Sequence, residues 1–204
     1  MYKSREELYI DICKDLPGTY IEVGTCWGGF SKFLIESTPC SMLFCVDPYR
    51  VFDRFEYFDA LNLATQADLD FKYDMVKQQL SAISNNRIHM LRVTSLEGAS
   101  FVRNESASFV YIDANHEYLH VKNDIMAWIP KVKPGGILAG DDVEPMELAH
   151  DLKNNAFIQH DKGPFGLYGV HKALIDIQKE NPWFDYTIYG GQFVWKKPLE
   201  FTLK

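Results

Sequence analysis

The sequence predicts a doubly wound α/β fold, in which helices cover both faces of a mostly parallel sheet. Short apolar runs of the kind expected for buried parallel strands alternate five times with segments of helical spacing. Several of these runs end at a glycine or an aspartate, where a strand passes into a helix. Near the C-terminus two further strand-like runs flank Gly190-Gly191, which indicates a β-hairpin at the edge of a seven-stranded sheet.

One domain is expected over residues 1–204, with an aromatic-rich insertion at about 50–67, because the chain is long enough to bury one full core. The first strand begins near Tyr20, which suggests a domain taken from a longer protein. A formal charge of −7 with scattered basic residues argues against a nucleic-acid or anionic-membrane surface and favours small or neutral partners. The four cysteines lack CxxC spacing and indicate reduced thiols of a cytoplasmic protein. No apolar run approaches the ~20 residues of a membrane-spanning helix.

The strands are expected where apolar runs follow turn residues. The first run follows the Pro-Gly turn at 17–18, and the fifth follows the Lys-Pro-Gly-Gly turn at 133–136. The expected strands are 19–23, 42–46, 87–93, 107–112, 137–139, 185–189 and 193–196.

Helices are expected between these strands from the spacing of their apolar residues. The short helix at 95–102 has Thr94 or Ser95 as its N-cap, with Glu97 nearby, and Pro130 ends a later helix. The insertion is also expected to be helical. The expected helices are the N-terminal segment up to residue 16, then 28–36, 68–83, 95–102, 118–129 and 170–180.

The first strand carries an acid near its end and runs into a glycine-rich turn. Gly24 permits the sharp turn, and Gly28 and Gly29 let a ligand or a neighbouring backbone approach closely. The glycine spacing is not that of a dinucleotide loop, and Glu22 would repel pyrophosphate but can help to hold an ammonium group. Asp47 ends the next strand, where a carboxylate can accept hydrogen bonds from a ribose diol. These residues together indicate S-adenosylmethionine (SAM), although tight helix-strand packing for Gly28 and Gly29 and helix capping for Asp47 remain alternatives.

Four segments resemble class I SAM-dependent methyltransferases and, more narrowly, their sugar O-methyltransferase branch, which includes macrocin-type, aminocoumarin-sugar and rhamnosyl enzymes. They are Ile-Glu-Val-Gly-Thr-Cys-Trp-Gly-Gly-Phe-Ser at 21–31, Val-Asp-Pro-Tyr at 46–49, Ile-Asp-Ala-Asn-His-Glu-Tyr at 112–118 and Lys-Pro-Gly-Gly-Ile-Leu-Ala-Gly-Asp-Asp-Val at 133–143. The similarity runs from about Tyr20 to Lys197. It implies a Rossmann-like fold and SAM contacts from Glu22, Gly24, Thr25, Gly28, Ser31, Asp47, Ser95 and Asp113.

The same resemblance implies methyl transfer to a sugar hydroxyl, such as that of a deoxysugar like rhamnose in a glycan. It extends to the methyltransferase domain of larger glycan-building proteins of large DNA viruses. That likeness would place the chain in the host cytoplasm, beside fused or partner glycosyltransferase domains. Ser95 lies where family members surround the adenine, but helix capping explains this serine equally well.

Three aspartates, Asp113, Asp141 and Asp142, follow the fourth and fifth strands. If these strands are neighbours, the carboxylates gather at the edge of the sheet where open α/β folds bind ligands. Oxygen ligands suit Mg²⁺, Mn²⁺ or Ca²⁺ better than zinc, and in metal-dependent relatives the matching aspartates hold such an ion. The alternative is that only one of Asp141 and Asp142 faces the site, because neighbouring side chains of a strand point to opposite faces.

We expect His116 to act as the base that accepts the proton of the sugar hydroxyl. Several sugar methyltransferases carry a second aspartate, proposed as the base, two residues beyond the one matching Asp113. This chain has Asn115 there, and a neutral amide cannot take a proton. His116 follows directly, and imidazole titrates near neutral pH. Capping of the next helix is an equally good explanation of His116, and the Asn115 change leaves a metal-independent enzyme open.

The acceptor is inferred from the aromatic residues around the insertion, which could stack on a sugar or simply pack on the sheet: Tyr49, Phe52, Phe55, Tyr57 and Phe58. The net acidity fits a neutral sugar better than a phosphorylated one. Two other functions stay open. The chain could be a catechol-type methyltransferase for small phenols, or a SAM-binding module without activity.

Overall fold

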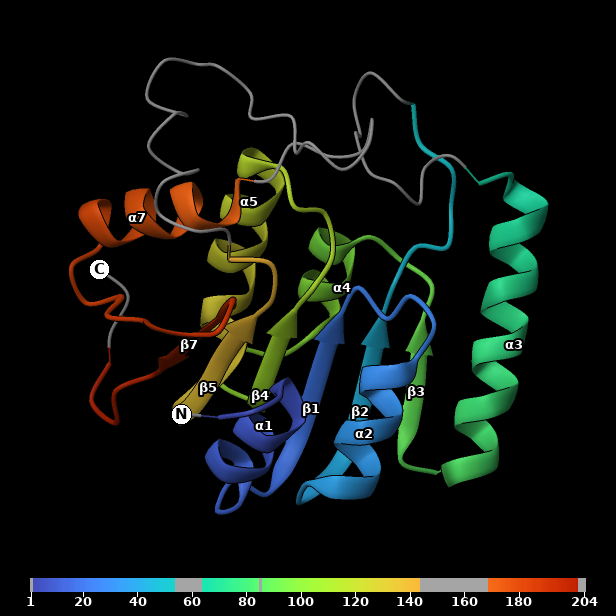
Figure 1. Cartoon of the computed structure of the whole chain (residues 1–204), viewed down its shortest axis with the longest axis horizontal. Coiled ribbons are helices and arrows are strands. Elements are labelled where there is room, and N and C mark those ends of the chain that lie inside the picture. Colours follow the sequence, from blue (N-terminus) through green and yellow to red (C-terminus); the bar gives the residue numbers. More distant parts are fainter. Residues whose placement is uncertain (1, 54–63, 85, 144–168, 202–204) are drawn as a thin grey trace.

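A computed structural model describes residues 2–53, 64–84, 86–143 and 169–201, and a seven-stranded sheet runs through its centre (Figure 1). The strands lie in the order β3-β2-β1-β4-β5-β7-β6. They are β1 Gly18–Val23, β2 Cys40–Val46, β3 Ile88–Leu91, β4 Ala107–Ile112, β5 Val132–Gly140, β6 Thr187–Tyr189 and β7 Gln192–Lys196. The predicted Rossmann-like, doubly wound sheet is confirmed.

The first five strands pair in parallel, and β7 joins β5 and β6 in antiparallel pairs. The expected C-terminal hairpin is therefore present at the edge of the sheet, and both glycines of its turn, Gly190 and Gly191, have positive φ. From β1 the chain proceeds outward through β2 and β3, then returns to β4 on the other side of β1. This reversal opens a crevice at the carboxyl ends of β1 and β4.

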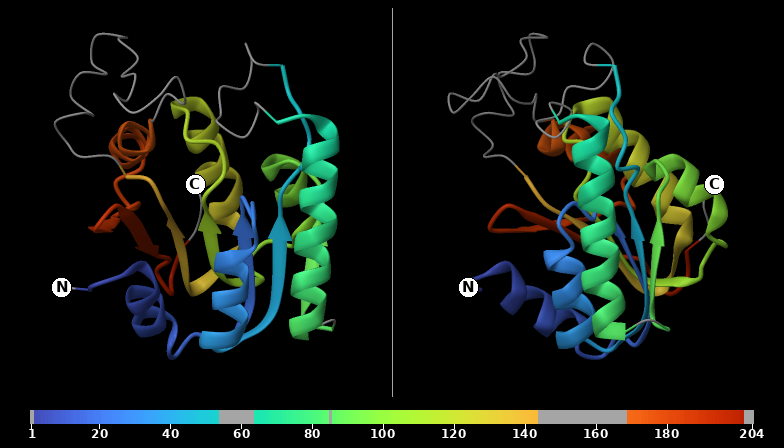
Figure 2. Two further views of the ribbon diagram at one scale, coloured as in Figure 1. Left: turned by 45° about the vertical axis from the view of Figure 1, so that its right-hand side comes forward. Right: turned by 90° about the vertical axis from the view of Figure 1, so that its right-hand side faces the viewer.

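Helices cover both faces of the sheet (Figure 2). Core residues of α1, α2 and α3 pack on one face, while those of α4, α5 and α7 pack on the other. The helices are α1 Arg5–Cys13, α2 Gly29–Ser37, α3 Gln66–Ser84, α4 Ser95–Phe101, α5 Tyr118–Trp128 and α7 Val170–Glu180, with a 3-10 turn, η2, at Ile129–Lys131. Within the described residues, none of these helices has the length and apolar character to cross a membrane.

Successive side chains of β1 face opposite layers, as the pleat of a strand requires. Tyr20 packs in the core under α1 and α2, whereas Ile21 and Val23 belong to the core under α5 and α7. Glu22 therefore points towards α2, where Ser31 bonds to it. This alternation decides which strand-end residues can reach the crevice.

The elements agree with the predicted order but differ at some ends. β5 begins at Val132 and includes the predicted Lys-Pro-Gly-Gly turn, because its pairing with β4 shifts register there and the stretch bulges. The N-terminal helix ends at Cys13 instead of residue 16. Of the two expected N-cap residues, Thr94 is the one that caps α4, and it forms a capping box with Glu97. Most of the predicted insertion, residues 54–63, lies outside the described residues.

Candidate cofactor and cation site

A cavity of about 340 Å³ opens at the carboxyl ends of β1, β2 and β4. Gly24, Asp47 and Asp113, which directly follow these three strands, all line it. Ser95 of α4 and Asp124 of α5 contribute to its wall. The site thus lies where the strand order reverses, which is the usual ligand position in open α/β sheets.

Gly24 holds the first loop against the fourth strand. Its φ is +94°, and a Cβ at this position would fall 1.8 Å from the backbone oxygen of Asp113. Gly28, at φ +71°, forms the N-cap of α2, and a Cβ there would meet Val76 of α3 at 2.9 Å. Gly28 does not line the cavity. The close neighbours of Gly28 thus belong to a helix and not to a strand, so the helix-strand packing raised as an alternative is not what is found. A Cβ at Gly29 would meet nothing within 4 Å, and cofactor contact stays a prediction for Gly28.

Glu22 and Ser31 lie beneath this loop. Both are buried, Ser31 donates a hydrogen bond to the Glu22 carboxyl, and the thiol of Cys45 lies 3.4 Å from the Ser31 hydroxyl. Burial raises the pKa of Glu22 to about 8, against the lowering effect of the Ser31 hydrogen bond. Neither Glu22 nor Ser31 lines the cavity, so direct contact with a cofactor stays a prediction for both. Thr25 is also buried, and its hydroxyl has no hydrogen-bond partner among the described residues.

Asp47 ties the first loop to the second. Its Oδ2 accepts a hydrogen bond from the backbone N–H of Cys26 at 2.9 Å, and its Oδ1 accepts one from the N–H of Tyr49 at 2.9 Å. The Tyr49 hydroxyl then donates to the Cys26 carbonyl at 2.8 Å. Asp47 caps no described helix, and its carboxylate is held at the cavity wall. Of the expected aromatic wall, Tyr49 and Phe52 line the cavity, while Phe55, Tyr57 and Phe58 lie outside the described residues.

Asn115 brings an unsatisfied donor to the cavity. The residue is 2% exposed, and its Oδ1 accepts the backbone N–H of Glu117 at 2.7 Å. Its Nδ2 is buried and has no partner within the described part of the chain. A buried amide donor without an acceptor costs free energy that a ligand acceptor can recover. The residue that replaces the expected second aspartate therefore faces a ligand cavity.

Asp124 is a site residue that the sequence reasoning missed. It is 5% exposed and lines the cavity beside Ser95, whose hydroxyl accepts the indole N–H of Trp128 at 2.9 Å. Burial raises the pKa of Asp124 to about 7, although its hydrogen bond with Ser95 lowers it. The sequence does contain a pattern that indicates Asp124: His120, Asn123 and Asp124 form one polar face of a helix, and all three line the cavity.

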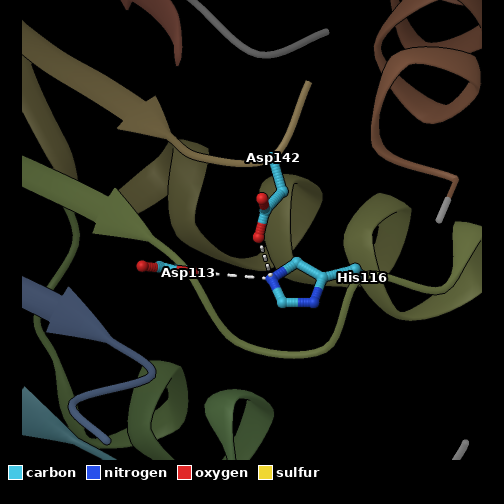
Figure 3. Close-up of side chains that lie close together, drawn as sticks. All are labelled: Asp113, His116 and Asp142. Atoms are coloured by element: carbon cyan, nitrogen blue, oxygen red, sulfur yellow. Dashed lines mark hydrogen bonds and ion pairs between the residues drawn. The ribbon is translucent and has the colours of Figure 1, made fainter. Parts of the chain in front are cut away.

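Asp113, His116 and Asp142 converge beyond the ends of β4 and β5 (Figure 3). The His116 Nε2 atom lies 2.9 Å from Asp142 Oδ2 and 3.5 Å from Asp113 Oδ1. Asp142 has a left-handed backbone, with φ 57°. Burial disfavours the charged imidazole, but the hydrogen bonds to Asp113 and then to Asp142 outweigh it and raise the pKa of His116 to about 10. The hydrogen bond from His116 in turn lowers the pKa of Asp142.

Asp141 does not join this group, contrary to the prediction that all three aspartates gather. Its Oδ2 accepts hydrogen bonds from Arg5 at 2.9 Å and from the Tyr111 hydroxyl at 3.1 Å, and its Oδ1 accepts one from Gln192. These partners lie on α1, β4 and β7. The alternative raised from the strand alternation is thus the observed one, and only Asp142 of the pair faces His116.

The group formed by Asp113, His116 and Asp142 could hold a cation, because one ligand atom from each residue lies within 4.8 Å of the others. Its donor set differs from the predicted three carboxylates, since an imidazole nitrogen takes the third place. Two carboxylates and an imidazole suit Mn²⁺ better than Mg²⁺ or Ca²⁺, which prefer oxygen ligands only.

Comparisons with known proteins point to one family. A family described as a methyltransferase domain matches residues 21–143, which is more than half of the chain. The search of curated proteins found no match.

Solved structures share the fold at low sequence identity. One is a candidate methyltransferase from Streptococcus mutans in complex with S-adenosylhomocysteine (SAH). It is 11% identical in sequence, the match covers 97% of this chain and 99% of the S. mutans chain, and the TM-score is 0.62. A candidate caffeoyl-CoA O-methyltransferase from Staphylococcus aureus is 15% identical; the match covers 97% of this chain and 85% of the S. aureus chain, with a TM-score of 0.62. A candidate O-methyltransferase from Klebsiella pneumoniae is 13% identical; the match covers 94% of this chain and 78% of the K. pneumoniae chain, with a TM-score of 0.59. At such identities the likeness concerns the fold.

Proposed function

Since the chain belongs to the methyltransferase domain family, we propose that it binds SAM in the cavity beside Gly24 and Asp47 and transfers the methyl group to a sugar hydroxyl. The observation that carries this proposal is the cavity itself. It lies at the strand-order reversal, and its wall holds carboxylates and an unsatisfied amide donor. A ligand with a diol and a heteroaromatic base would use both kinds of group.

The residues present fit an adenosyl cofactor. The Asp47 carboxylate, held by two backbone N–H groups, can accept hydrogen bonds from a ribose diol. The Asn115 Nδ2 needs an acceptor, and a purine ring nitrogen is one. The Asp124 carboxylate can accept a hydrogen bond from the exocyclic amine of adenine. Asn115 is thus proposed as a cofactor contact.

The acceptor hydroxyl is proposed to bind near Asp113, which borders both the cavity and the group with His116 and Asp142. A divalent cation held there would lower the pKa of a bound hydroxyl. The role of His116 as the base stays a prediction. The two ion pairs keep its imidazole protonated in the geometry described, and a protonated imidazole cannot accept the proton of the hydroxyl. We propose instead that Nε2, the atom that contacts both carboxylates, is the third cation ligand, which requires a neutral imidazole.

The choice of a hydroxyl acceptor is supported by two structural neighbours that are candidate O-methyltransferases. A sugar is favoured by the sequence resemblance and by the acidic net charge. A small phenol is the second candidate, because one neighbour is a candidate caffeoyl-CoA O-methyltransferase. The two acceptors differ chemically, since a phenol ionises more easily than a sugar alcohol and needs less help from a base or a cation.

Calorimetry with SAM and SAH, followed by an acceptor screen, tests this proposal. We expect both cofactors to bind and methyl transfer to a rhamnoside or a related sugar, measured by the appearance of SAH. Transfer to catechols but not to sugars would select the phenol enzyme. Binding of SAM without transfer to any acceptor would favour a non-catalytic module, and absence of SAM binding would refute the proposal.

A further inference from the structure

Cys26 differs from the other three cysteines of the chain. Cys13, Cys40 and Cys45 are buried in the core, whereas Cys26 is half-buried and lines the cavity. Its Sγ atom lies 3.0 Å from the Nζ atom of Lys72. This is a thiol beside a cation, at the wall of a ligand site.

The backbone holds the Cys26 sulfur in place. The residue adopts a left-handed conformation, with φ 51°, and its N–H and C=O groups are bound by Asp47 and Tyr49 at 2.9 and 2.8 Å. A non-glycine residue in this conformation is uncommon and is kept there by its surroundings. The sulfur therefore has a defined position relative to Lys72.

Lys72 is an unusual residue for the wall of a cavity. It belongs to α3, is 5% exposed and also lines the cavity. Its ammonium group lies 4.5 Å from the ring centroid of Trp27. Among the described residues, no carboxylate lies within ion-pair distance of it. The ammonium group of Lys72 is thus placed to stabilise the negative charge that develops on the Cys26 sulfur when this sulfur reacts.

We propose that Cys26 is a modification site for small disulfides and that its modification closes the cofactor cavity. The Cys26 thiol loses its proton to solvent, and the thiolate attacks one sulfur of the disulfide. A mixed disulfide forms, the original S–S bond breaks, and the other half leaves as a thiolate that takes up a proton. The attached group occupies the cavity, and a reducing thiol reverses the reaction. The regulatory part of this proposal rests on the proposed binding of SAM in that cavity.

The other cysteines provide internal controls. Burial raises the pKa of Cys13 and of Cys40 to about 12, and it raises the pKa of Cys45 further. These thiols are both inaccessible and reluctant to ionise, so a reagent that needs a thiolate should not reach them in the folded chain.

The test is to incubate the folded full chain with cystamine and to follow each cysteine by peptide mass spectrometry, with and without SAH. We expect Cys26 to react at least about tenfold faster than the other three. Lys72→Met should slow this reaction about tenfold, and Lys72→Arg should retain most of the rate because it keeps the charge. Lys77→Met, on the same helix, is the matched control and should react like the native chain. SAH should protect Cys26, and cystamine should abolish SAH binding until dithiothreitol is added.

Equal labelling of the four cysteines would refute the proposal that Cys26 is the reactive one. An unchanged rate of Cys26 modification in a folded Lys72→Met variant would refute the role of Lys72. If SAH binds by calorimetry but does not protect Cys26, the modification does not close the cofactor cavity. If SAH does not bind at all, the proposed function fails, while the dependence of labelling on Lys72 still decides the reactivity of Cys26.

Discussion

Asp141 and Asp142 are consecutive in the chain, yet their carboxylates belong to different networks. Asp142 Oδ2 lies 2.9 Å from His116 Nε2, whereas Asp141 Oδ2 lies 2.9 Å from Arg5 Nη1. The backbone of Asp142, just beyond the end of β5, is left-handed, and this turns the Asp142 side chain towards His116 while the Asp141 side chain points to Arg5. Arg5 also lies 3.7 Å from Asp113, so α1 contributes a positive charge to the edge of the site.

This division predicts different effects of two neighbouring substitutions on cation binding. Asp142→Asn should weaken Mn²⁺ binding by at least about tenfold, because it removes one of the two carboxylates that face His116. Asp141→Asn should leave Mn²⁺ affinity nearly unchanged but lower the melting temperature, because Arg5 loses the shortest of its ion pairs. Titration calorimetry and thermal unfolding measure both quantities. Equal losses of Mn²⁺ affinity in the two variants would contradict the division.

His116 is expected to act on the cation and the reaction, and not on the cofactor. His116→Ala should lower turnover strongly and reduce Mn²⁺ affinity, while SAH affinity stays within about twofold because His116 does not line the cavity. EDTA should stop methyl transfer, and Mn²⁺ should restore it. Full activity in EDTA, lost only in His116→Ala, would instead support His116 as a base without a cation.

Gly24 and Gly29 should respond oppositely to alanine. Gly24→Ala places a Cβ 1.8 Å from the Asp113 backbone oxygen at a positive φ, so we expect a loss of more than about 3 kcal/mol of stability, or failure to fold. Gly29→Ala meets nothing within 4 Å in the first turn of α2 and should stabilise the chain by about 0.5–1 kcal/mol. Urea unfolding measures both. A well-folded Gly24→Ala would mean that β1 and β4 can move apart.

Glu22 should make the cofactor-free chain less stable as the pH rises. The carboxyl ionises near pH 4.5 when unfolded but near pH 8 when folded, so the folded chain binds the extra proton between these values. The free energy of unfolding therefore falls across this window, by up to about 5 kcal/mol for this group.

Glu22→Gln removes this contribution. The difference in stability between the variant and the native chain should grow in favour of the variant as the pH rises from about 5 to about 8, and it should change little below about pH 5. Ser31→Ala is the companion variant, because it removes the hydrogen bond that lowers the pKa of Glu22 and should extend the loss to higher pH. Parallel stability curves for Glu22→Gln and the native chain would refute the assignment.

Asp124 is expected to make the site selective for adenine. S-inosylhomocysteine replaces the amine of adenine with a carbonyl, so the native chain should bind SAH at least about tenfold more tightly. Asp124→Asn should reduce this preference, because its amide can donate to the carbonyl. Asp176→Asn on α7, outside the cavity, is the control and should keep the native ratio. An unchanged ratio in Asp124→Asn would remove this residue from base recognition.

Much of the fold was predictable because local patterns determine it. The alternation of buried strands with amphipathic helices fixed the order of the elements, and the Thr94–Glu97 capping box and the Gly190-Gly191 turn are local sequence signals. The start of β5 was missed, because its pairing with β4 carries the Pro-Gly-Gly stretch through a bulge that no local pattern reveals.

The doubly wound sheet can be read from the sequence, and so can the residues that follow its strands: Gly24, Asp47, Asp113 and the aspartate pair. The partners of the acidic side chains around the site, in contrast, follow from how the helices and strands pack together. Glu22 lies beneath the loop because the pleat of β1 turns it towards Ser31, and Asp141 turns to Arg5 and Gln192, which lie far away in sequence. The alternation of a strand says that Glu22 and its neighbours face opposite ways, but not that α2 covers the Glu22 face. It contains neither the φ of Asp142 nor the distant partners of Asp141.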